Sequence, residues 1–206
     1  HTPALAESVA RWASRLGGRT LVLTTTLRAA DRLAARLVEL TALGRCGPLK
    51  VLAQGRGSKR ALLERFRVAT EASVLVASAS FWEGVDLPGD ALQLLVIDKL
   101  PFPPPDDPLM EARARQLEVK GLNAFTDGFL PETAMALKQG AGRLIRSESD
   151  HGILVIGDRR LLSRSYGNRL LAALPPMRRL EDETEMAEAL DALVLTRAST
   201  RGCRPI

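Results

Sequence analysis

Residues Ser73–Ser78 read SVLVAS, and residues Leu92–Asp98 read LQLLVID. Both runs are apolar on the two faces of an extended chain, which is typical of strands buried inside a parallel sheet. Shorter runs of the same kind occupy Thr20–Thr25, Leu49–Ala53 and Gly152–Gly157. We therefore expect these strands to form a buried, mainly parallel sheet.

Helical patterns separate the strands. Apolar residues recur at helical spacing in Leu27–Leu40, and Ser58–Ala69 begins with a favourable N-cap serine. Further helices are expected from Pro131 to about Arg146 and at Leu161–Leu174. Strands and helices that alternate in this way predict a right-handed, three-layer α/β/α fold.

The proline-rich stretch Leu100–Pro105 (LPFPPP) interrupts this alternation. Proline has no N–H for a helix or an inner strand, so the stretch is interpreted as a stiff connector. Asp106 or Asp107 can cap the helix that follows, with Pro108 at its first position.

The composition limits the class of protein. Apolar residues make up 46% of the 206 residues, which argues against wholesale disorder. The net charge of +5 gives modest support to a phosphate-bearing partner, because a basic surface also serves solubility. Cys46 and Cys203 have no CxxC spacing and no histidine partner. A disulfide framework, a zinc site or an iron–sulfur cluster is therefore not expected within this chain.

The two ends of the chain are expected to be helices attached to a single domain that covers residues 1–206. Leu5, Val9, Trp12 and Leu16 predict an amphipathic helix within residues 1–18, and residues 178–206 are expected to form a short helical tail. No run approaches the roughly 20 apolar residues that span a bilayer, and no signal peptide is visible, so we expect a cytoplasmic protein without membrane contact. The lack of an initiator methionine suggests a piece of a longer protein, although processing during purification would also remove it.

The sharpest motif is QGAGRLIR at Gln139–Arg146, within a predicted helix. Gln139, Arg143 and Arg146 stand at i, i+4 and i+7, so they share one helical face. Two neighbouring guanidinium groups repel each other, and Gly140 and Gly142 lower helix propensity. The pattern therefore weakens the helix unless an anion binds there. Because the planar fork of arginine matches phosphate oxygens, the motif indicates arginines that act on a transferring phosphoryl group.

The alternative for this motif is a solvated basic face paired with Glu148 or Asp150. Spacing alone does not decide between the two interpretations.

A second motif, SFWEGVDLPGD at Ser80–Asp90, directly follows the strand SVLVAS. In doubly wound sheets, ligands bind at the carboxyl ends of the strands. Glu83 and Asp86 place two acids around Gly84, which allows close backbone approach, and Asp86 can orient a ribose or an arginine. Trp82 offers a stacking surface. The alternative is an ordinary Pro-Gly turn with the tryptophan in the core.

A third segment, GRGSK at Gly55–Lys59, superficially suggests a phosphate loop. It is too short, and it lacks a serine or threonine after its lysine, so we reject it as a nucleotide cradle and expect a basic loop before a capped helix. The 206 residues contain no true phosphate loop and no acidic box that would hold Mg²⁺.

Two weaker signals follow the first and last strands. Thr24–Thr26 and Arg28 lie at the end of the first strand, where we expect contact with a DNA phosphate, although threonines there are as often helix caps. Asp158 is expected to form a structural salt-bridge turn with the arginines that follow it.

In this order and spacing, FWEGVD, LPFPPPDDP, QGAGRLIR and VIGDRRL resemble the C-terminal motor domain of DinG/YoaA-type helicases, relatives of XPD in helicase superfamily 2. The resemblance covers about Thr20–Pro176. It implies a RecA-like domain, related to the P-loop NTPase fold but without its own phosphate loop. Such enzymes bind ATP between two RecA-like domains and move 5′ to 3′ along single-stranded DNA.

The resemblance also implies roles for individual residues. The motif whose arginines reach the γ-phosphate matches Gln139, Gly142, Arg143 and Arg146. The motif that couples the nucleotide to DNA matches Glu83, Gly84 and Asp86.

The other parts of such an enzyme are expected elsewhere in the same polypeptide. The first RecA-like domain would bind ATP with Mg²⁺ and, in many relatives, a 4Fe–4S cluster. Single-stranded DNA and that first domain are the expected partners, and a bacterial, nucleoid-associated location is implied. We expect the chain alone to show no ATPase activity.

Two other interpretations remain open at this point. One is a non-catalytic nucleic-acid or protein interaction module that keeps the fold. The other is a complete nucleotide-binding enzyme of another class, which would need a phosphate loop of its own.

Overall fold

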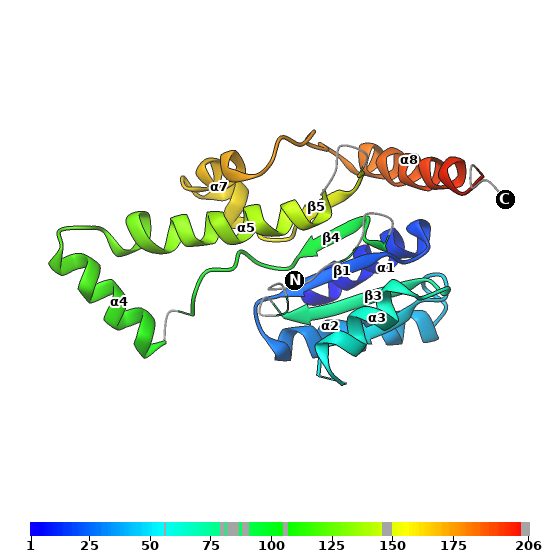
Figure 1. The fold of residues 1–206 in the computed structure, drawn as a ribbon, viewed down its shortest axis with the longest axis horizontal. Helices are drawn as coiled ribbons and strands as arrows, with labels where there is room; N and C mark the ends of the chain where they lie inside the picture. The colour runs from blue at the N-terminus through cyan, green and yellow to red at the C-terminus, as the bar shows by residue number, and fades with distance from the viewer. Residues whose placement is uncertain are drawn as a thin grey trace. The chain divides into compact units, whose positions relative to one another are not determined.

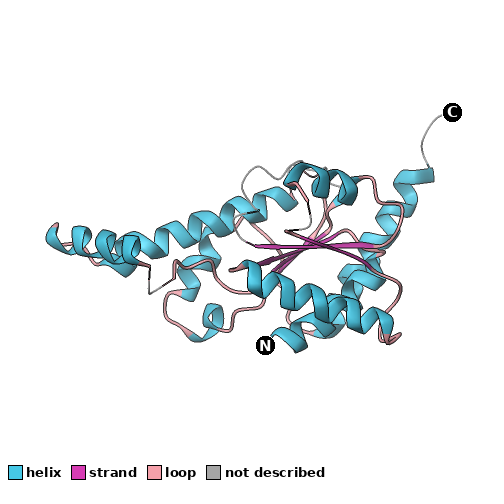
Figure 2. Ribbon diagram, turned by 90° about the horizontal axis from the view of Figure 1, so that it is seen from below, coloured by secondary structure: helices cyan, strands magenta, loops and turns pink. Residues whose placement is uncertain are grey.

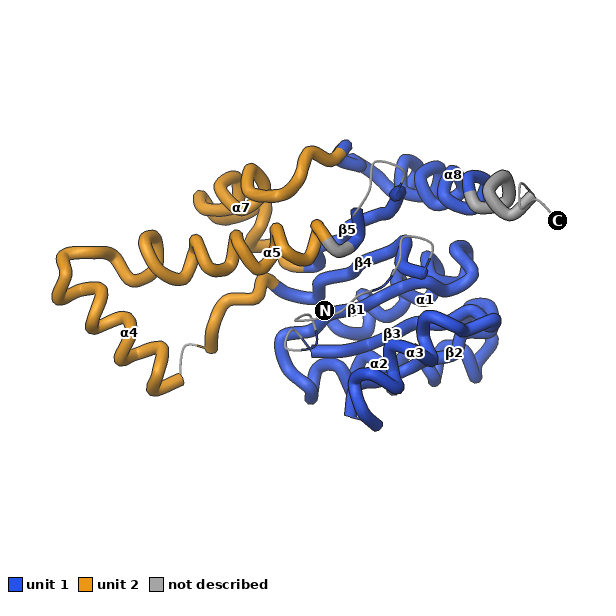
Figure 3. The backbone as a smooth tube through the Cα atoms, in the orientation of Figure 1, with its two compact units in different colours: residues 1–99, 143–157, 178–206 blue, residues 100–142, 158–177 orange. Residues whose placement is uncertain are grey.

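The structure is a computed structural model that describes residues 1–55, 57–78, 81, 87, 91–104, 107–145 and 150–202; of residues 143 and 197–202 it describes only the backbone. The chain divides into two compact units (Figure 3). Unit 1 comprises residues 1–99, 143–157 and 178–206, and unit 2 comprises residues 100–142 and 158–177. The assignment of the whole chain to one domain stays a prediction.

Unit 1 contains a five-stranded sheet with the order β2-β3-β1-β4-β5, in which all neighbouring strands are parallel (Figure 1). The strands are β1 (Thr20–Thr24), β2 (Lys50–Ala53), β3 (Ser73–Ser78), β4 (Leu94–Ile97) and β5 (Ile153–Ile156). Every residue of β1, β3 and β4 is buried, because helices cover both faces of the sheet. The predicted parallel sheet is confirmed.

The helices of unit 1 lie on both faces of this sheet (Figure 2). They are α1 (Thr2–Leu16), α2 (Leu27–Ala42), α3 (Lys59–Arg67) and α8 (Glu183–Gly202). The apolar faces of α1, α2 and α8 share one core with alternate strand residues, among them Val22, Val74, Val76 and Val96. A right-handed crossover from β2 back to β3 places α3 on the opposite face. The three-layer α/β/α prediction is therefore confirmed.

Unit 2 is helical. It contains α4 (Pro108–Val119), the π-helix η3 (Ala124–Phe129), most of α5 (Leu130–Leu144), α6 (Arg160–Ser163) and α7 (Gly167–Ala173). Asp107 caps α4, because its carboxylate accepts a hydrogen bond from Leu109 N at 2.9 Å. Of the two predicted caps, Asp106 lies outside the described residues.

The single helix predicted at Leu161–Leu174 is wrong. The chain forms two helices there, α6 and α7, and leaves helical geometry between Ser163 and Gly167. A Cβ atom on Gly167 would lie 1.9 Å from the carbonyl oxygen of Leu161. The lack of a side chain at Gly167 therefore lets the second helix begin directly against the first.

None of the helices in the described residues is both long enough and apolar enough to cross a lipid bilayer.

Candidate nucleotide and nucleic-acid site

The carboxyl ends of the strands meet at one edge of the sheet in unit 1. Thr24, the last residue of β1, pairs with Ser78, the last residue of β3. On the other side of β1, the N–H of Asp98, directly after β4, donates to the Leu23 carbonyl at 2.8 Å. This edge is where parallel α/β sheets bind ligands, because the loops and helix N-termini converge there.

The three candidate DNA-binding residues after β1 lie at this edge. Thr25, Thr26 and Arg28 are all exposed, whereas Thr24 is buried and its hydroxyl donates to the Thr26 carbonyl at 2.8 Å. The hydroxyl of Thr26 accepts a hydrogen bond from Ala29 N at 3.1 Å and so caps α2. The capping interpretation therefore holds for Thr26, and DNA contact by Thr25 and Arg28 stays a prediction.

Gln54, directly after β2, holds the end of β3. Its side-chain oxygen accepts hydrogen bonds from Ser78 N at 2.7 Å and from Ser78 Oγ at 3.0 Å. This contact fixes the backbone at the point from which residues 79–90 continue, and sequence reasoning missed it. A glutamine at a strand end before a glycine is a weak local signal, since its partner is 24 residues away.

Most residues of the second motif, Trp82, Glu83, Gly84 and Asp86, lie outside the described residues. Their neighbours Phe81 and Leu87 are buried. The Lys59 ammonium group lies 5.1 Å from the centre of the Phe81 ring, a cation–π distance. Ser58 caps α3 by accepting from Ala61 N at 3.2 Å. The predicted capped helix after GRGSK is confirmed, and the rejection of GRGSK as a phosphate loop stays a prediction.

The first motif lies on α5, whose two faces differ. Leu137, Ala141 and Leu144 are buried, whereas Gln139 and Gly142 are exposed. A Cβ atom on Gly142 would meet no described atom within 4 Å. Packing within the described chain therefore does not require a glycine at this position.

The two arginines of the motif are described incompletely. The backbone of Arg143 belongs to α5, and Arg146 lies outside the described residues. The helix ends at Leu144, two residues before the predicted end, within the usual uncertainty of helix boundaries. The placement of both arginine side chains on one face stays a prediction.

Asp158 forms the expected structural turn in unit 2. Its carboxylate pairs with the Arg160 guanidinium at 2.7 Å and accepts from the backbone N–H groups of Arg160 at 2.9 Å and Leu100 at 3.0 Å. Burial alone would raise the pKa of the Asp158 carboxyl, but these hydrogen bonds outweigh burial and lower that pKa below its ordinary value. The turn therefore joins the connector after β4 to the segment after β5.

Comparison with known proteins identifies the family. Residues 9–177, well over half of the chain, match the helicase C-terminal domain family. The chain belongs to that family. The resemblance noted in the sequence is thereby confirmed, and the five-stranded parallel sheet is the core of a helicase C-terminal domain.

This helicase C-terminal domain is homologous to DinG and YoaA proteins. It is 49% identical over 142 residues to the ATP-dependent DNA helicase YoaA of Haemophilus influenzae, which covers 69% of this chain and 22% of that protein. It is 38% identical over 185 residues to the ATP-dependent helicase DinG of Mycobacterium tuberculosis, and the match covers 90% of this chain and 27% of that protein. The 3'-5' exonuclease DinG of Bacillus subtilis is 43% identical over 129 residues, and the match covers 62% of this chain and 14% of that protein. The chain thus spans about a quarter or less of the length of these relatives.

Proposed function

We propose that this helicase C-terminal domain is the second motor domain of an ATP-dependent DNA helicase that moves 5′ to 3′. In this proposal Gln139, Arg143 and Arg146 complete an ATPase site whose phosphate loop lies on the first motor domain of the same polypeptide. ATP is the substrate, with Mg²⁺ held mainly by that first domain, which is also where a 4Fe–4S cluster would sit. A cytoplasmic, nucleoid-associated location follows from a DNA substrate.

The exposed gap at Gly142 supports the proposal most directly. A glycine inside a helix costs about 1 kcal/mol relative to alanine, and nothing described around Gly142 needs the space. A nucleotide or a neighbouring domain that approaches the helix backbone closely would occupy that space. Gln139, exposed three residues earlier, adds a side-chain amide that can bond a phosphate oxygen or its attacking water.

The arginines would act by charge. During phosphoryl transfer, negative charge spreads over the oxygens of the γ-phosphate, and a guanidinium group placed there stabilises that charge. Arg143 and Arg146 would meet this charge only when the two motor domains close on ATP. Binding of ATP would therefore favour the closed state, and hydrolysis would release it.

The carboxyl edge of the sheet would couple this cycle to DNA. Glu83, Gly84 and Asp86 follow β3, and Gly84 would permit close backbone approach to the nucleotide. Thr25, Thr26, Arg28 and Trp82 would contribute to the single-stranded DNA groove. The Gln54–Ser78 hydrogen bonds support this assignment, because they fix the chain where the segment with the acids begins.

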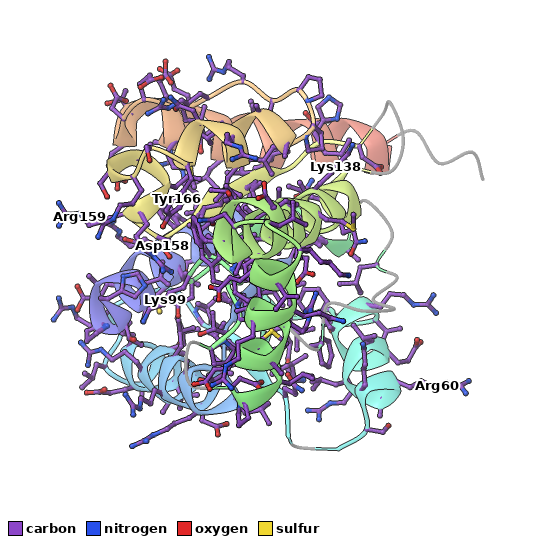
Figure 4. The ribbon with its side chains drawn as sticks, turned by 90° about the vertical axis from the view of Figure 1, so that its left-hand side faces the viewer. Arg60, Lys99, Lys138, Asp158, Arg159 and Tyr166 are labelled. Carbon is purple, nitrogen blue, oxygen red and sulfur yellow. The ribbon has the colours of Figure 1, made fainter. Side chains whose placement is uncertain are left out.

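The test is made in the full-length protein. Arg146→Ala and Arg143→Ala should each lower DNA-stimulated ATP hydrolysis by about 10³-fold or more, because a phosphate-sensing arginine acts mainly on the transition state. Binding of ATP, measured with a fluorescent analogue, should change little. Lys138→Ala is the matched control, since it removes an exposed cation from the same helix (Figure 4). Wild-type turnover in both arginine variants would remove them from the site.

The match to a protein named as an exonuclease favours a second candidate function. The same fold would then serve as a nucleic-acid-binding module that hydrolyses no ATP. Full-length protein that binds single-stranded DNA but shows no ATP hydrolysis with or without DNA would select this second candidate.

A further inference from the structure

Three aromatic rings from separate segments of unit 2 meet in one cluster. Phe102 comes from the proline-rich connector, Phe125 from the π-helix η3, and Tyr166 from the break between α6 and α7. The ring centres of Phe102 and Phe125 lie 5.5 Å apart at 27°, which is a stacked arrangement. Tyr166 meets both rings edge-on, at 5.6 and 5.2 Å. We call these three residues the aromatic cluster.

The aromatic cluster reaches the surface at Phe125. This side chain is 38% exposed and is the only aromatic among the exposed large hydrophobic residues of the described chain. Aromatic residues make up only 4% of the sequence. An aromatic ring gains most of its stabilising free energy from burial, so a solvent-exposed ring backed by two others suggests a surface used for stacking.

The contacts behind the cluster hold it in place. The Arg160 guanidinium lies 5.4 Å from the centre of the Phe102 ring, and the same guanidinium is paired with Asp158. Asp158 also accepts from Leu100 N, two residues before Phe102. The cation–π contact on its ring and the hydrogen bond at Leu100 both restrain Phe102, which therefore supports Phe125 rigidly. A rigid surface loses little conformational entropy when a ligand binds.

Two cationic side chains lie on the segment that carries Tyr166. Arg159 and Arg164 are both exposed and form no ion pair within the described residues, and Arg159 extends outward beside Asp158 (Figure 4). Proteins that hold single strands combine stacking rings for the bases with cations for the backbone.

We propose that the aromatic cluster is a base-stacking platform for single-stranded nucleic acid, with a base on the exposed face of Phe125 and backbone phosphates on Arg159 and Arg164. This proposal rests on the proposed function and names a part of the DNA path within unit 2. It concerns no residue of the ATPase motifs.

The experiment compares two single strands of equal length in the full-length protein. One is ordinary DNA, and the other carries abasic sugars throughout, so that it has the same phosphates but no bases. Phe125→Ala should weaken binding to ordinary DNA about 5-fold or more and leave binding to the abasic strand unchanged, because a stacked base contributes far more than a bare sugar. Phe125→Trp should restore affinity for ordinary DNA.

Two further variants separate stacking from charge and from general damage. Arg159→Ala should weaken binding to both strands equally and lower the salt slope of log K by about 0.7, the loss of one phosphate contact on a single strand. Val119→Ala is the control, since it shortens an apolar side chain of unit 2 that is 89% exposed. It should bind both strands as the wild type does.

Two results would overturn the platform. One is wild-type affinity of Phe125→Ala for ordinary DNA, and the other is an equal loss on both strands. Failure of the wild-type protein to bind either strand would instead remove the proposed function, so the two failures are distinguishable.

Discussion

At the scale of single residues, Gly142 has a stability effect and a proposed functional effect of opposite sign. Gly142→Ala should stabilise α5 by about 0.5–1 kcal/mol, because alanine loses less backbone entropy in a helix and finds open space there. The same methyl group should obstruct the approach of the nucleotide and lower ATP hydrolysis. Thermal unfolding and ATPase rates of the full-length variant measure both effects.

The two signs must differ for this prediction to hold. A merely structural glycine would lose stability and activity together. Gly142→Ala that is more stable and fully active would show that no ligand uses the gap.

The role of Gln54 can be tested against Gln93, a second glutamine that accepts a hydrogen bond beside a strand. Gln54→Leu removes an acceptor for Ser78 at the carboxyl edge. Gln93→Leu removes an acceptor for the Arg19 guanidinium, 2.6 Å away, just before β4. Each loss of a hydrogen bond should cost about 1 kcal/mol of unfolding free energy. Only Gln54→Leu should also lower DNA-stimulated ATP hydrolysis, by about 10-fold or more, since it misplaces the segment that begins at residue 79.

Rescue completes the Gln54 test. Gln54→Glu keeps an oxygen acceptor for both Ser78 donors and should retain more activity than Gln54→Leu. Equal losses of activity in Gln54→Leu and Gln93→Leu would reduce the role of Gln54 to general stability.

At the scale of elements, the turn at Asp158 links the start of α6 to the proline-rich connector. Hydrogen bonding lowers the pKa of Asp158 in the folded chain, so its charged form stabilises the fold at pH values above the unfolded pKa of about 3.9. This stabilisation is lost as the pH falls through the lower, folded pKa. We expect Asp158→Asn to cost about 1 kcal/mol at pH 7, because the Arg160 side chain is 43% exposed and water screens the pair.

The pH dependence of unfolding tests this sign. The difference in unfolding free energy between the wild type and Asp158→Asn should be constant from pH 7 to about pH 5 and should shrink on further acidification. A difference that grows towards low pH would contradict the assignment.

The elements also show what the sequence can and cannot predict. Local apolar runs predicted β3 and β4, since a buried parallel strand needs little besides such a run. The π-helix η3 escaped prediction, because its one-turn pattern differs little from that of the α-helix it precedes. The break before Gly167 depends on the distance of this residue from the Leu161 carbonyl, which periodicity does not encode.

The same distinction applies to the candidate site. The motif QGAGRLIR predicted a helix there, and the helix is confirmed; the shared face of Gln139, Arg143 and Arg146 stays a prediction, because the structure describes only the first of these side chains. The Gln54–Ser78 contact and the aromatic cluster were not predicted, since each joins residues that are far apart in the chain. Non-local contacts of this kind become visible only when the fold is known.

At the scale of the whole molecule, the proposed function makes this chain one part of a divided catalytic unit. The 206 residues contain no phosphate loop, and the chain spans 22% of YoaA from Haemophilus influenzae. In the proposed function, this helicase C-terminal domain would supply residues to the terminal phosphate and a surface for DNA. The groups that bind the nucleotide phosphates would then lie on the other motor domain.

Comparing ATP hydrolysis by the purified 206-residue chain with that of the full-length protein, each with and without single-stranded DNA, tests this claim most directly. We predict no turnover by the chain under either condition and DNA-stimulated turnover by the full-length protein. Hydrolysis by the chain alone, at a rate that follows its concentration and survives further purification, would contradict a site divided between two domains.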